Sequence, residues 1–261
     1  MGGADRRVTR RIDYDRRLHA VYERGRSLLE EAIDTWMAEL ARHVKPTRPL
    51  KVLDLGSGTG RFSRALADTF GGPVYGVEPS KKMISVATTR AIDPRVHYIR
   101  GFAEAIPLKD DSVDVTVLYF VLHHVVNKQR AATELARVMP RDGTLFIRMN
   151  FSDRMPDAFW YQFFDRAKEV DASMSQPVGD VIELFVEAGF QGVALEEVEF
   201  VEAANKRELF DRLSYRAVSP FELMDDREIE EGLRAMERAV DRAPDAEPVV
   251  SRGDLLVLRR S

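Results

Sequence analysis

The sequence has 261 residues, a formal net charge of −4 at pH 7 and no cysteine. The absence of cysteine excludes disulfides, thiolate metal sites and a cysteine nucleophile. The acidic balance argues against a general nucleic-acid binder, which is usually basic, and no apolar run approaches the roughly 18 residues of a membrane span. The arginine-rich first 17 residues lack the hydrophobic stretch of a secretory signal, so we expect a cytoplasmic protein with no membrane partner.

The first 50 residues are predicted to form a helical arm. Residues 1–20 are polar and charged, which is typical of a solvated segment. Between residues 21 and 44, apolar side chains recur at three- and four-residue steps, which predicts one helix with a single apolar face. Pro46 and Pro49 are expected to end this helix.

Residues 51–150 alternate between short apolar strands and helices. The strands are expected at 51–55, 74–77, 95–100, 112–120 and 143–149, and the helices at 60–70, 80–90 and 127–138. Buried strands separated by helices of this length indicate βαβ units. Because the crossovers of such units are right-handed, the pattern predicts a doubly wound α/β sheet with helices on both faces.

The last third of the sequence has a different pattern. Helices are expected at 156–169, 178–188, 205–218 and 226–241, and strands at 193–201 and 254–259. No internal repeat, low-complexity tract or clear linker separates this part from the preceding one. We therefore expect a single domain over residues 1–261.

A glycine loop joins the first strand to its helix. Gly56, Gly58 and Gly60 are spaced G-x-G-x-G, and Asp54 precedes them by two residues. The dinucleotide fingerprint G-x-G-x-x-G requires a glycine where Arg61 stands. A diphosphate is disfavoured beside Asp54 because the two anions repel, whereas an ammonium or sulfonium group is attracted. An ordinary strand–helix turn is the alternative.

The segment 54–60 resembles motif I of the class I S-adenosylmethionine-dependent methyltransferases. Within this family, the resemblance is to the small-molecule, type 11-like methyltransferase domains. It implies a Rossmann-like, seven-stranded mixed sheet that ends in an antiparallel pair, here 193–201 and 254–259. The segment 134–143 resembles the family's helix and turn before the fifth strand. The resemblance divides the chain into an N-terminal helical arm or lid (1–50), a cofactor-binding half (51–150), and acceptor-site insertions with the closing strands (151–261).

The resemblance also implies the cofactor, S-adenosylmethionine, and its product, S-adenosylhomocysteine. Glu78 ends the second strand, where the family's acid accepts hydrogen bonds from both ribose hydroxyls. Phe102 stands where many relatives have an aspartate that binds the adenine, so backbone groups near Ala103 or Glu104 are expected to take over that contact. The full expected cofactor set is Asp54, Gly56, Ser57, Gly58, Gly60, Glu78, Pro79, Met83, Phe102, Ala103, Glu104 and Tyr119.

Two adjacent histidines follow the fourth strand, where ligands bind in open α/β sheets. His123 and His124 are candidate general bases for removing a proton from the acceptor, with His124 slightly preferred. The alternative is that they cap a helix or position the cofactor or acceptor.

Other side chains near the strand ends are expected to bind the acceptor. Arg148 could hold an anionic acceptor group with two hydrogen bonds, or it could pair with Asp54 or Glu78. Asn150 follows it. The aromatic residues Phe159, Trp160 and Phe163 could line an acceptor pocket or pack in the core of an inserted helix. Tyr14 belongs to the arm that would cover the cofactor as a lid.

The favoured function is methyl transfer to an O, N or C atom of a small, apolar or aromatic metabolite, of the kind found in secondary metabolism. The alternatives are an RNA or protein methyltransferase, an NAD-dependent oxidoreductase, and a binding protein without turnover. No metal site is expected, because the acidic pairs sit in polar turns and the histidines lack ligand spacing. A small-molecule acceptor is the expected partner and nucleic acid is not; the sequence leaves a homo-oligomer open.

Overall fold

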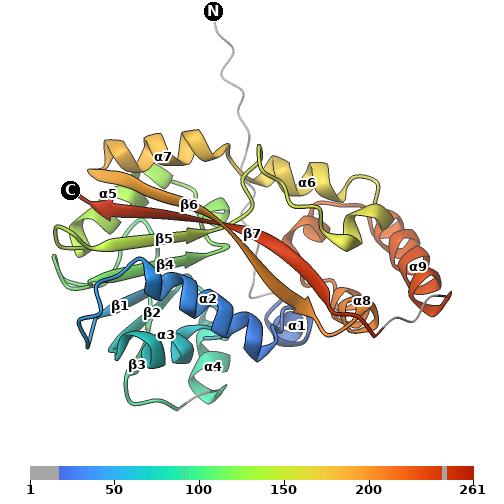
Figure 1. Cartoon of the computed structure of the whole chain (residues 1–261), viewed down its shortest axis with the longest axis horizontal. Coiled ribbons are helices and arrows are strands. Elements are labelled where there is room, and N and C mark those ends of the chain that lie inside the picture. Colours follow the sequence, from blue (N-terminus) through green and yellow to red (C-terminus); the bar gives the residue numbers. More distant parts are fainter. Residues whose placement is uncertain (1–17, 91, 243–245) are drawn as a thin grey trace, which may run out of the picture.

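The computed structural model describes residues 18–90, 92–242 and 246–261, and a seven-stranded sheet lies at its centre (Figure 1). Across the sheet the order is β3 (Val96–Arg100), β2 (Val74–Glu78), β1 (Val52–Leu55), β4 (Val115–Tyr119), β5 (Thr144–Arg148), β7 (Val249–Arg260) and β6 (Phe190–Ala203). Strands β1 to β5 are parallel, and β7 pairs antiparallel with both β5 and β6. The predicted doubly wound, mixed α/β sheet is confirmed.

The strand order reverses between β1 and β4, which are paired side by side. In an open parallel sheet, ligands bind outside the carboxyl ends of the strands at such a reversal. The register places Tyr119, at the end of β4, opposite Arg148, at the end of β5. The topology therefore gathers the glycine loop, Tyr119 and Arg148 at one edge of the sheet.

Nine α-helices occur in the described part of the chain. They are α1 (Leu18–Gly25), α2 (Glu30–Arg42), α3 (Ser63–Phe70), α4 (Lys81–Arg90), α5 (Lys128–Val138), α6 (Ala167–Met174), α7 (Val178–Glu187), α8 (Lys206–Ser214) and α9 (Asp226–Arg242). Three short 3-10 helices are η1 (Leu122–His124), η2 (Phe159–Phe163) and η3 (Ser219–Glu222).

Two predicted helices were wrong in their extent. The single helix expected over 21–44 is divided into α1 and α2, because α1 ends at Gly25 and Leu29 is extended, with φ −64° and ψ 148°. The helix expected over 156–169 is replaced by η2 and α6, because Ala158 and Phe164 are extended at the two ends of η2. In this second case the aromatic side chains pack into a core from a 3-10 turn, so tertiary packing overrides the helical pattern.

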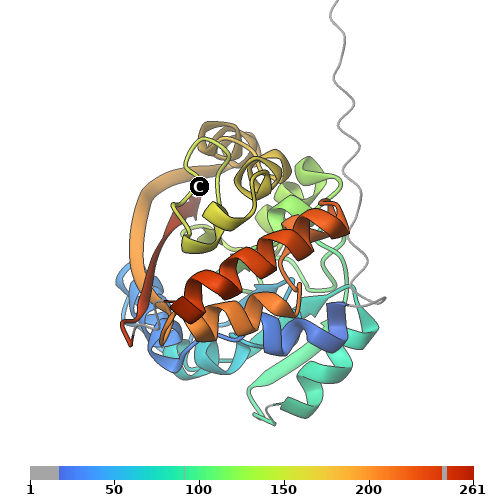
Figure 2. The same cartoon turned by 90° about the vertical axis from the view of Figure 1, so that its right-hand side faces the viewer.

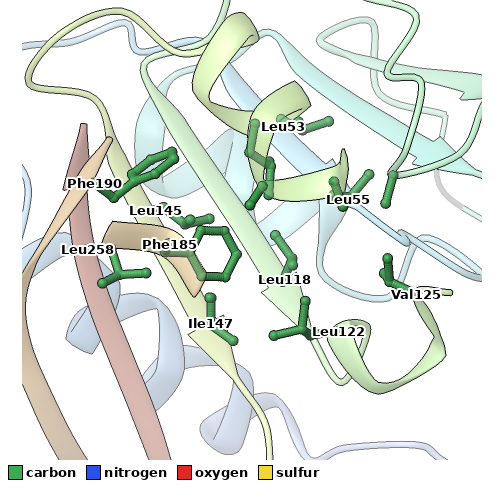
Figure 3. Packing of buried hydrophobic residues seen from close by; sticks show 14 of the residues in the cluster. Leu53, Leu55, Leu118, Leu122, Val125, Leu145, Ile147, Phe185, Phe190 and Leu258 are labelled. Carbon is green, nitrogen blue, oxygen red and sulfur yellow. The ribbon is translucent and has the colours of Figure 1, made fainter. Parts of the chain in front are cut away.

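The sheet has a separate hydrophobic core on each face. Leu145 and Ile147 of β5 pack with side chains of α5 and α7, including Leu135 and Phe185 (Figure 3). Phe146, between them in the strand, packs instead with Trp36 of α2 and the residues of α3. Because side chains alternate along a strand, Arg148 falls on the face that carries α2.

A helical layer covers the carboxyl ends of the strands. Helices α1, α6, α8 and α9 lie beyond the sheet in Figure 1 and cross in front of it in Figure 2. A third hydrophobic core, which includes Trp160, Phe164, Leu209 and Phe221, holds this layer together. Strands β6 and β7 extend from the sheet into the layer, so the layer is anchored directly above the predicted ligand edge.

Candidate active site

A cavity of about 340 Å³ lies at the carboxyl ends of β1, β2 and β4. We call it the first cavity. Its walls come from the glycine loop, the end of β2, the start of α4, the loop after β3 and the segment after β4. Among its lining residues are Leu55, Gly56, Gly58, Glu78, Pro79, Met83, Phe102, Ala103, Glu104, Tyr119, Phe120, Val121 and His124.

The glycine loop follows the wall of this cavity in a left-handed backbone conformation. Gly56, Gly58 and Gly60 have φ values of 72°, 57° and 74°, which disfavour any residue with a Cβ. A Cβ on Gly56 would also collide with Val121, and one on Gly60 with Tyr98. A Cβ on Gly58 would meet nothing closer than Met83 Cε at 3.8 Å, so this glycine faces open space.

Glu78 presents a fixed carboxylate to the first cavity. It is 7% exposed, and its Oε2 accepts a hydrogen bond from the Gly58 N–H at 3.1 Å. Its Oε1 accepts from the Ser80 N–H at 2.9 Å. Each carboxylate oxygen can accept more than one hydrogen bond. The carboxylate is therefore oriented by the backbone while keeping capacity for a ligand with two neighbouring hydroxyls.

The loop after β3 supplies an aromatic ring and backbone groups. Phe102 is 39% exposed and its ring lines the first cavity, at the place where a flat ligand could stack on an aromatic side chain. The Glu104 carboxylate accepts the N–H groups of Val126 and Asn127, both at 3.2 Å. This carboxylate therefore ties the loop to the start of α5.

Asp54 lies behind the glycine loop and is 4% exposed. Its Oδ2 accepts a hydrogen bond from the Ser63 hydroxyl at 2.7 Å. Burial raises the pKa of Asp54 from 3.8 to about 6, although the hydrogen bond from Ser63 and the charge of Arg61 act in the opposite direction. At neutral pH the site thus holds a buried carboxylate beneath the turn.

A second cavity, of about 140 Å³, lies between the ends of β4 and β5 and the helical layer. Its lining includes the basic residues Arg26, Arg61, Arg148, Arg212 and Arg252, the acidic residues Asp171 and Glu202, and the aromatic residues Tyr119, Phe120, Trp160, Tyr161 and Phe200, together with His123 and Asn150. Cationic and aromatic groups from six elements thus converge at the edge of the sheet.

Tyr119 and Phe120 line both cavities. Phe120 has a φ of 57°, a conformation that costs a non-glycine residue about 1–2 kcal/mol. Its N–H donates to the Arg148 carbonyl at 2.8 Å, which ties this backbone to the end of β5. Strained residues of this kind gather at functional sites, and here the strained residue stands where the two cavities adjoin.

Comparisons with known proteins support the same cofactor site. Residues 53–147 match the family model described as a methyltransferase domain. This segment contains the glycine loop, Glu78 and the strained turn after β4. Residues 53–147 of this chain are therefore similar to methyltransferase domains, the class that the motif at 54–60 resembles.

Curated relatives match about half of this chain. A demethylmenaquinone methyltransferase of Clavibacter sepedonicus is 35% identical over 130 residues, which cover 49% of this chain and 53% of the relative. An uncharacterized methyltransferase of Mycobacterium tuberculosis is 41% identical over 133 residues, or 51% of this chain and 50% of the relative. The chain therefore spans about half the length of these curated relatives.

A solved structure extends the likeness in fold to most of the chain. A protein described as a methyltransferase from an antibiotic biosynthesis pathway of Anabaena variabilis aligns with a TM-score of 0.69 at 23% identity. The alignment covers 87% of this chain and 96% of that one. At this identity the likeness concerns the fold, including the helical layer outside the matched family segment.

The structure separates the two histidines. His124 lines the first cavity and His123 the second, with their ring centroids 3.9 Å apart. His123 is 9% exposed. Burial lowers the pKa of His123 well below 6.5, and the nearby charges of His124, Arg26 and Lys128 lower it further. His123 therefore keeps a neutral ring at physiological pH.

The predicted cofactor residues do not all reach the first cavity. Gly56, Gly58, Glu78, Pro79, Met83, Phe102, Ala103, Glu104 and Tyr119 line it. Asp54, Ser57 and Gly60 are absent from its lining and lie behind it. Gly60 packs beneath Tyr98 and Ala87, and the Ser57 hydroxyl is buried without a hydrogen-bond partner in the described part of the chain.

The predicted acceptor residues are divided in a similar way. Arg148, Asn150, His123 and Trp160 line the second cavity. Phe159 and Phe163 pack against the core of the helical layer. Tyr14 lies outside the described residues, as does the part of the predicted lid that carries it. The alternative pairing of Arg148 with Asp54 or Glu78 is wrong, because neither carboxylate lies within 4.0 Å of it; the guanidinium stacks over the rings of Phe120 and Trp36, at 4.6 and 4.8 Å.

Several residues of the second cavity were missed by the sequence analysis. Arg61 was considered only as a missing glycine, and Arg212 and Asp171 were not considered at all. Arg212 is 8% exposed within an α8 face that otherwise buries Leu209 and Leu213. A basic residue on an apolar helix face was the available signal, since buried charges are rare without a functional or structural partner.

One group of side chains away from both cavities has ligand-like spacing. Glu39 of α2, His43 directly after α2 and Glu196 of β6 have potential ligand atoms within 4.8 Å of one another. His43 Nε2 lies 3.2 Å from Glu39 and 3.5 Å from Glu196, as expected for a histidine shared by two carboxylates. The statement that the histidines lack ligand spacing is corrected for His43, while the expected absence of a metal remains a prediction. In the described part of the chain, no helix is long and apolar enough to cross a membrane.

Proposed function

We propose that this chain transfers a methyl group from S-adenosylmethionine to an O, N or C atom of a small molecule with an apolar or aromatic body. The observation that carries the proposal is the pair of cavities that adjoin at Tyr119 and Phe120. The first is lined by the residues of the cofactor motif. The second is lined largely by the chain's own helical layer, which favours a small acceptor over RNA or a protein.

The first cavity fits the cofactor chemically. Gly58 leaves open space beside the loop, Glu78 offers a fixed carboxylate for the ribose hydroxyls, and Phe102 offers an exposed ring beside the adenine loop. When bound, S-adenosylmethionine supplies an electrophilic methyl group on a sulfonium. The chain contributes alignment, since in-line displacement requires the acceptor atom to be held in the correct direction.

His123 is the better-placed base of the two histidines. It lines the acceptor side, and its lowered pKa keeps the ring neutral. For an O–H or N–H acceptor, the His123 ring would take up the proton that the acceptor atom loses when it is methylated. The placement of the rings thus moves our preference from His124 to His123.

We expect His123→Gln to lower kcat by about 100-fold or more, the usual range for loss of a general base, with little change in cofactor affinity. We expect His124→Gln to weaken cofactor binding instead, because His124 lines the first cavity. Isothermal titration with S-adenosylhomocysteine and steady-state kinetics separate the two effects. A wild-type kcat in His123→Gln would remove it from the mechanism.

The proposal is tested by incubating the chain with S-adenosylmethionine carrying a labelled methyl group and a small-molecule metabolite extract. Label should appear in a small product identified by mass spectrometry. Parallel incubations with total RNA and with a protein extract test the alternative acceptors, and label appearing only in one of these contradicts the small-molecule assignment. Saturable NAD binding without S-adenosylmethionine binding would instead favour the oxidoreductase alternative.

A further inference from the structure

Three arginines that line the second cavity lie inside the fold and have no acidic partner among residues 18–90, 92–242 and 246–261. Arg148 is 4% exposed and Arg212 is 8% exposed, while Arg61 is half-buried. Within the described ranges, none of the three forms an ion pair, although many surface arginines of the chain do. A buried charge without a counter-charge is costly, so an arrangement of three such groups indicates a missing anion.

The protein groups that hold these arginines are neutral. Arg212 donates to the carbonyls of Ser27 and Glu202, and Arg61 donates to the carbonyl of Arg26. The Nε atoms of Arg61, Arg148 and Arg212 are buried without a hydrogen-bond partner in the part of the chain that the structure describes. These hydrogen bonds fix the orientation of the guanidinium groups. Their Nε–H donors and their positive charges can therefore serve a ligand.

The two carboxylates of the second cavity are already engaged. Asp171 accepts hydrogen bonds from the Tyr161 hydroxyl at 2.6 Å and from Asn150 Nδ2 at 3.0 Å. Glu202 accepts from the Ser251 hydroxyl at 2.5 Å. Arg252 forms ion pairs with Glu197 and Glu199 outside the lining, but the three arginines without an ion pair in the described ranges still exceed the two acids of the lining. A cationic acceptor would be repelled by this surplus, and an anionic one attracted.

We propose that the second cavity binds an acceptor that carries an oxyanion group, either a carboxylate or a phosphate, held by Arg61, Arg148 and Arg212. The planar guanidinium groups suit both oxyanions because each can donate two hydrogen bonds at once. The rings of Trp160, Phe200 and Phe120 line the same cavity and can pack against an apolar or aromatic body. The inference rests on the proposed function for the role of the ligand as acceptor.

The oxyanion serves as the binding handle, and another atom of the acceptor receives the methyl group. Hydrogen bonds from arginine stabilise the negative charge of an oxyanion, and methylating that oxygen would neutralise the charge. Those interactions would therefore be weaker in the transition state than in the ground state, which opposes reaction at that oxygen. The reacting atom is accordingly placed toward Tyr119 and His123, where the cavities adjoin.

The test is a calorimetric titration of the full chain, loaded with S-adenosylhomocysteine, with benzoate, phenyl phosphate and the neutral isostere benzamide. We expect benzoate or phenyl phosphate to bind at least about tenfold more tightly than benzamide, as loss of a charged hydrogen bond predicts. Whichever of benzoate and phenyl phosphate binds more tightly shows whether the site prefers a carboxylate or a phosphate. Equal binding of all three probes, or binding of none, overturns the proposal.

Variants of the arginines locate the effect. Arg148→Gln and Arg212→Gln are each expected to weaken the preferred anion by about tenfold or more. The control is Arg234→Gln, an exposed residue of α9 outside the cavity lining, which should leave the affinity unchanged. Affinity for S-adenosylhomocysteine reports folding of each variant, and Arg212→Gln stands in if Arg148→Gln does not fold. Unchanged anion binding in the folded variants overturns the proposal.

Failure of the anion site is distinguishable from failure of the proposed function. If S-adenosylhomocysteine does not bind, the methyltransferase proposal fails, while the preference for benzoate over benzamide is still measured on the unloaded chain. If S-adenosylhomocysteine binds but benzoate, phenyl phosphate and benzamide bind equally well, only the oxyanion inference fails.

Discussion

Gly58→Arg is expected to abolish cofactor binding while leaving the protein folded. The Gly58 Cα faces the open first cavity, and a Cβ there would meet nothing closer than Met83 Cε at 3.8 Å. The long side chain would therefore extend into the space between the glycine loop and Glu78 and exclude the ligand. We expect no measurable affinity for S-adenosylmethionine at ligand concentrations up to about 1 mM, which corresponds to a binding free energy weaker than about −4 kcal/mol.

Two control variants separate occlusion from other effects of this substitution. Gly58→Ala imposes the same left-handed backbone, at φ 57°, on a residue with a Cβ but leaves the cavity open. It should lose about 1–2 kcal/mol of stability and retain most of its cofactor affinity. Gly179→Arg adds the same charged side chain at an open position of α7 and should change neither property. Comparable affinities for Gly58→Arg and Gly58→Ala in calorimetry contradict the assignment of the first cavity.

The cofactor side of the site could be predicted because its residues are close together in the sequence. Gly56, Gly58 and Glu78 belong to two consecutive strand–turn units, whose ends are placed together by the parallel register alone. Strand alternation and turn chemistry are local properties and placed Gly56 and Gly58 at the end of the first strand, whereas the role of Glu78 followed from the resemblance of the segment 54–60 to motif I. The same reasoning fails for Asp54, which has the expected position in the chain but directs its carboxylate to Ser63.

The acceptor side depends on contacts that no local pattern contains. Arg61 follows the glycine loop and Arg148 ends β5, whereas Arg212 belongs to α8, and only the helical layer brings them to one cavity. The sequence pattern also did not indicate which group the Arg148 side chain contacts. Side-chain alternation places it on the α2 face, where the ring of Trp36 lies 4.8 Å away, rather than beside a carboxylate.

The division of the N-terminal helix has the same origin. The periodic apolar residues of 21–44 gave no sign of a break, yet the chain turns after Gly25. A Cβ at Gly25 would collide with that of Ala217, so the close approach of α1 to the helical layer depends on this glycine. Tertiary packing thus sets the end of α1.

Asp54→Asn is expected to stabilise the protein at neutral pH and to weaken its discrimination between S-adenosylmethionine and S-adenosylhomocysteine. Burial raises the pKa of Asp54 from 3.8 to about 6. The folded state therefore holds this proton more tightly than the unfolded state, and the contribution of Asp54 to stability falls as the pH rises from about 4 to about 6. A shift of about two pKa units corresponds to about 3 kcal/mol. Above about pH 6, where Asp54 is charged in both the folded and the unfolded state, burial of this charge lowers the free energy of unfolding by that whole amount.

Asparagine removes the charge and keeps an oxygen that can accept the hydrogen bond from Ser63. The free energy of unfolding of Asp54→Asn, from urea titration, should exceed that of the wild type by up to about 3 kcal/mol at pH 8 and by much less at pH 4. Ser63→Ala is the matched control: it leaves the charge in place, removes the hydrogen bond that lowers the pKa, and should destabilise the protein at pH 8. A constant difference between Asp54→Asn and wild type from pH 4 to pH 8 contradicts the raised pKa.

The stability gained by Asp54→Asn should be accompanied by a loss in ligand selectivity. S-adenosylmethionine carries a sulfonium charge that S-adenosylhomocysteine lacks, and a buried carboxylate beneath the glycine loop attracts that charge across a medium of low polarity. Removing about 1 kcal/mol of this attraction lowers the ratio of the two affinities about fivefold. Titration of both ligands into wild type and variant at pH 8 measures the ratio. An unchanged affinity ratio would mean that the Asp54 charge affects only the stability of the fold. A lower ratio in the variant would show that this destabilising carboxylate helps the site to select a cationic ligand.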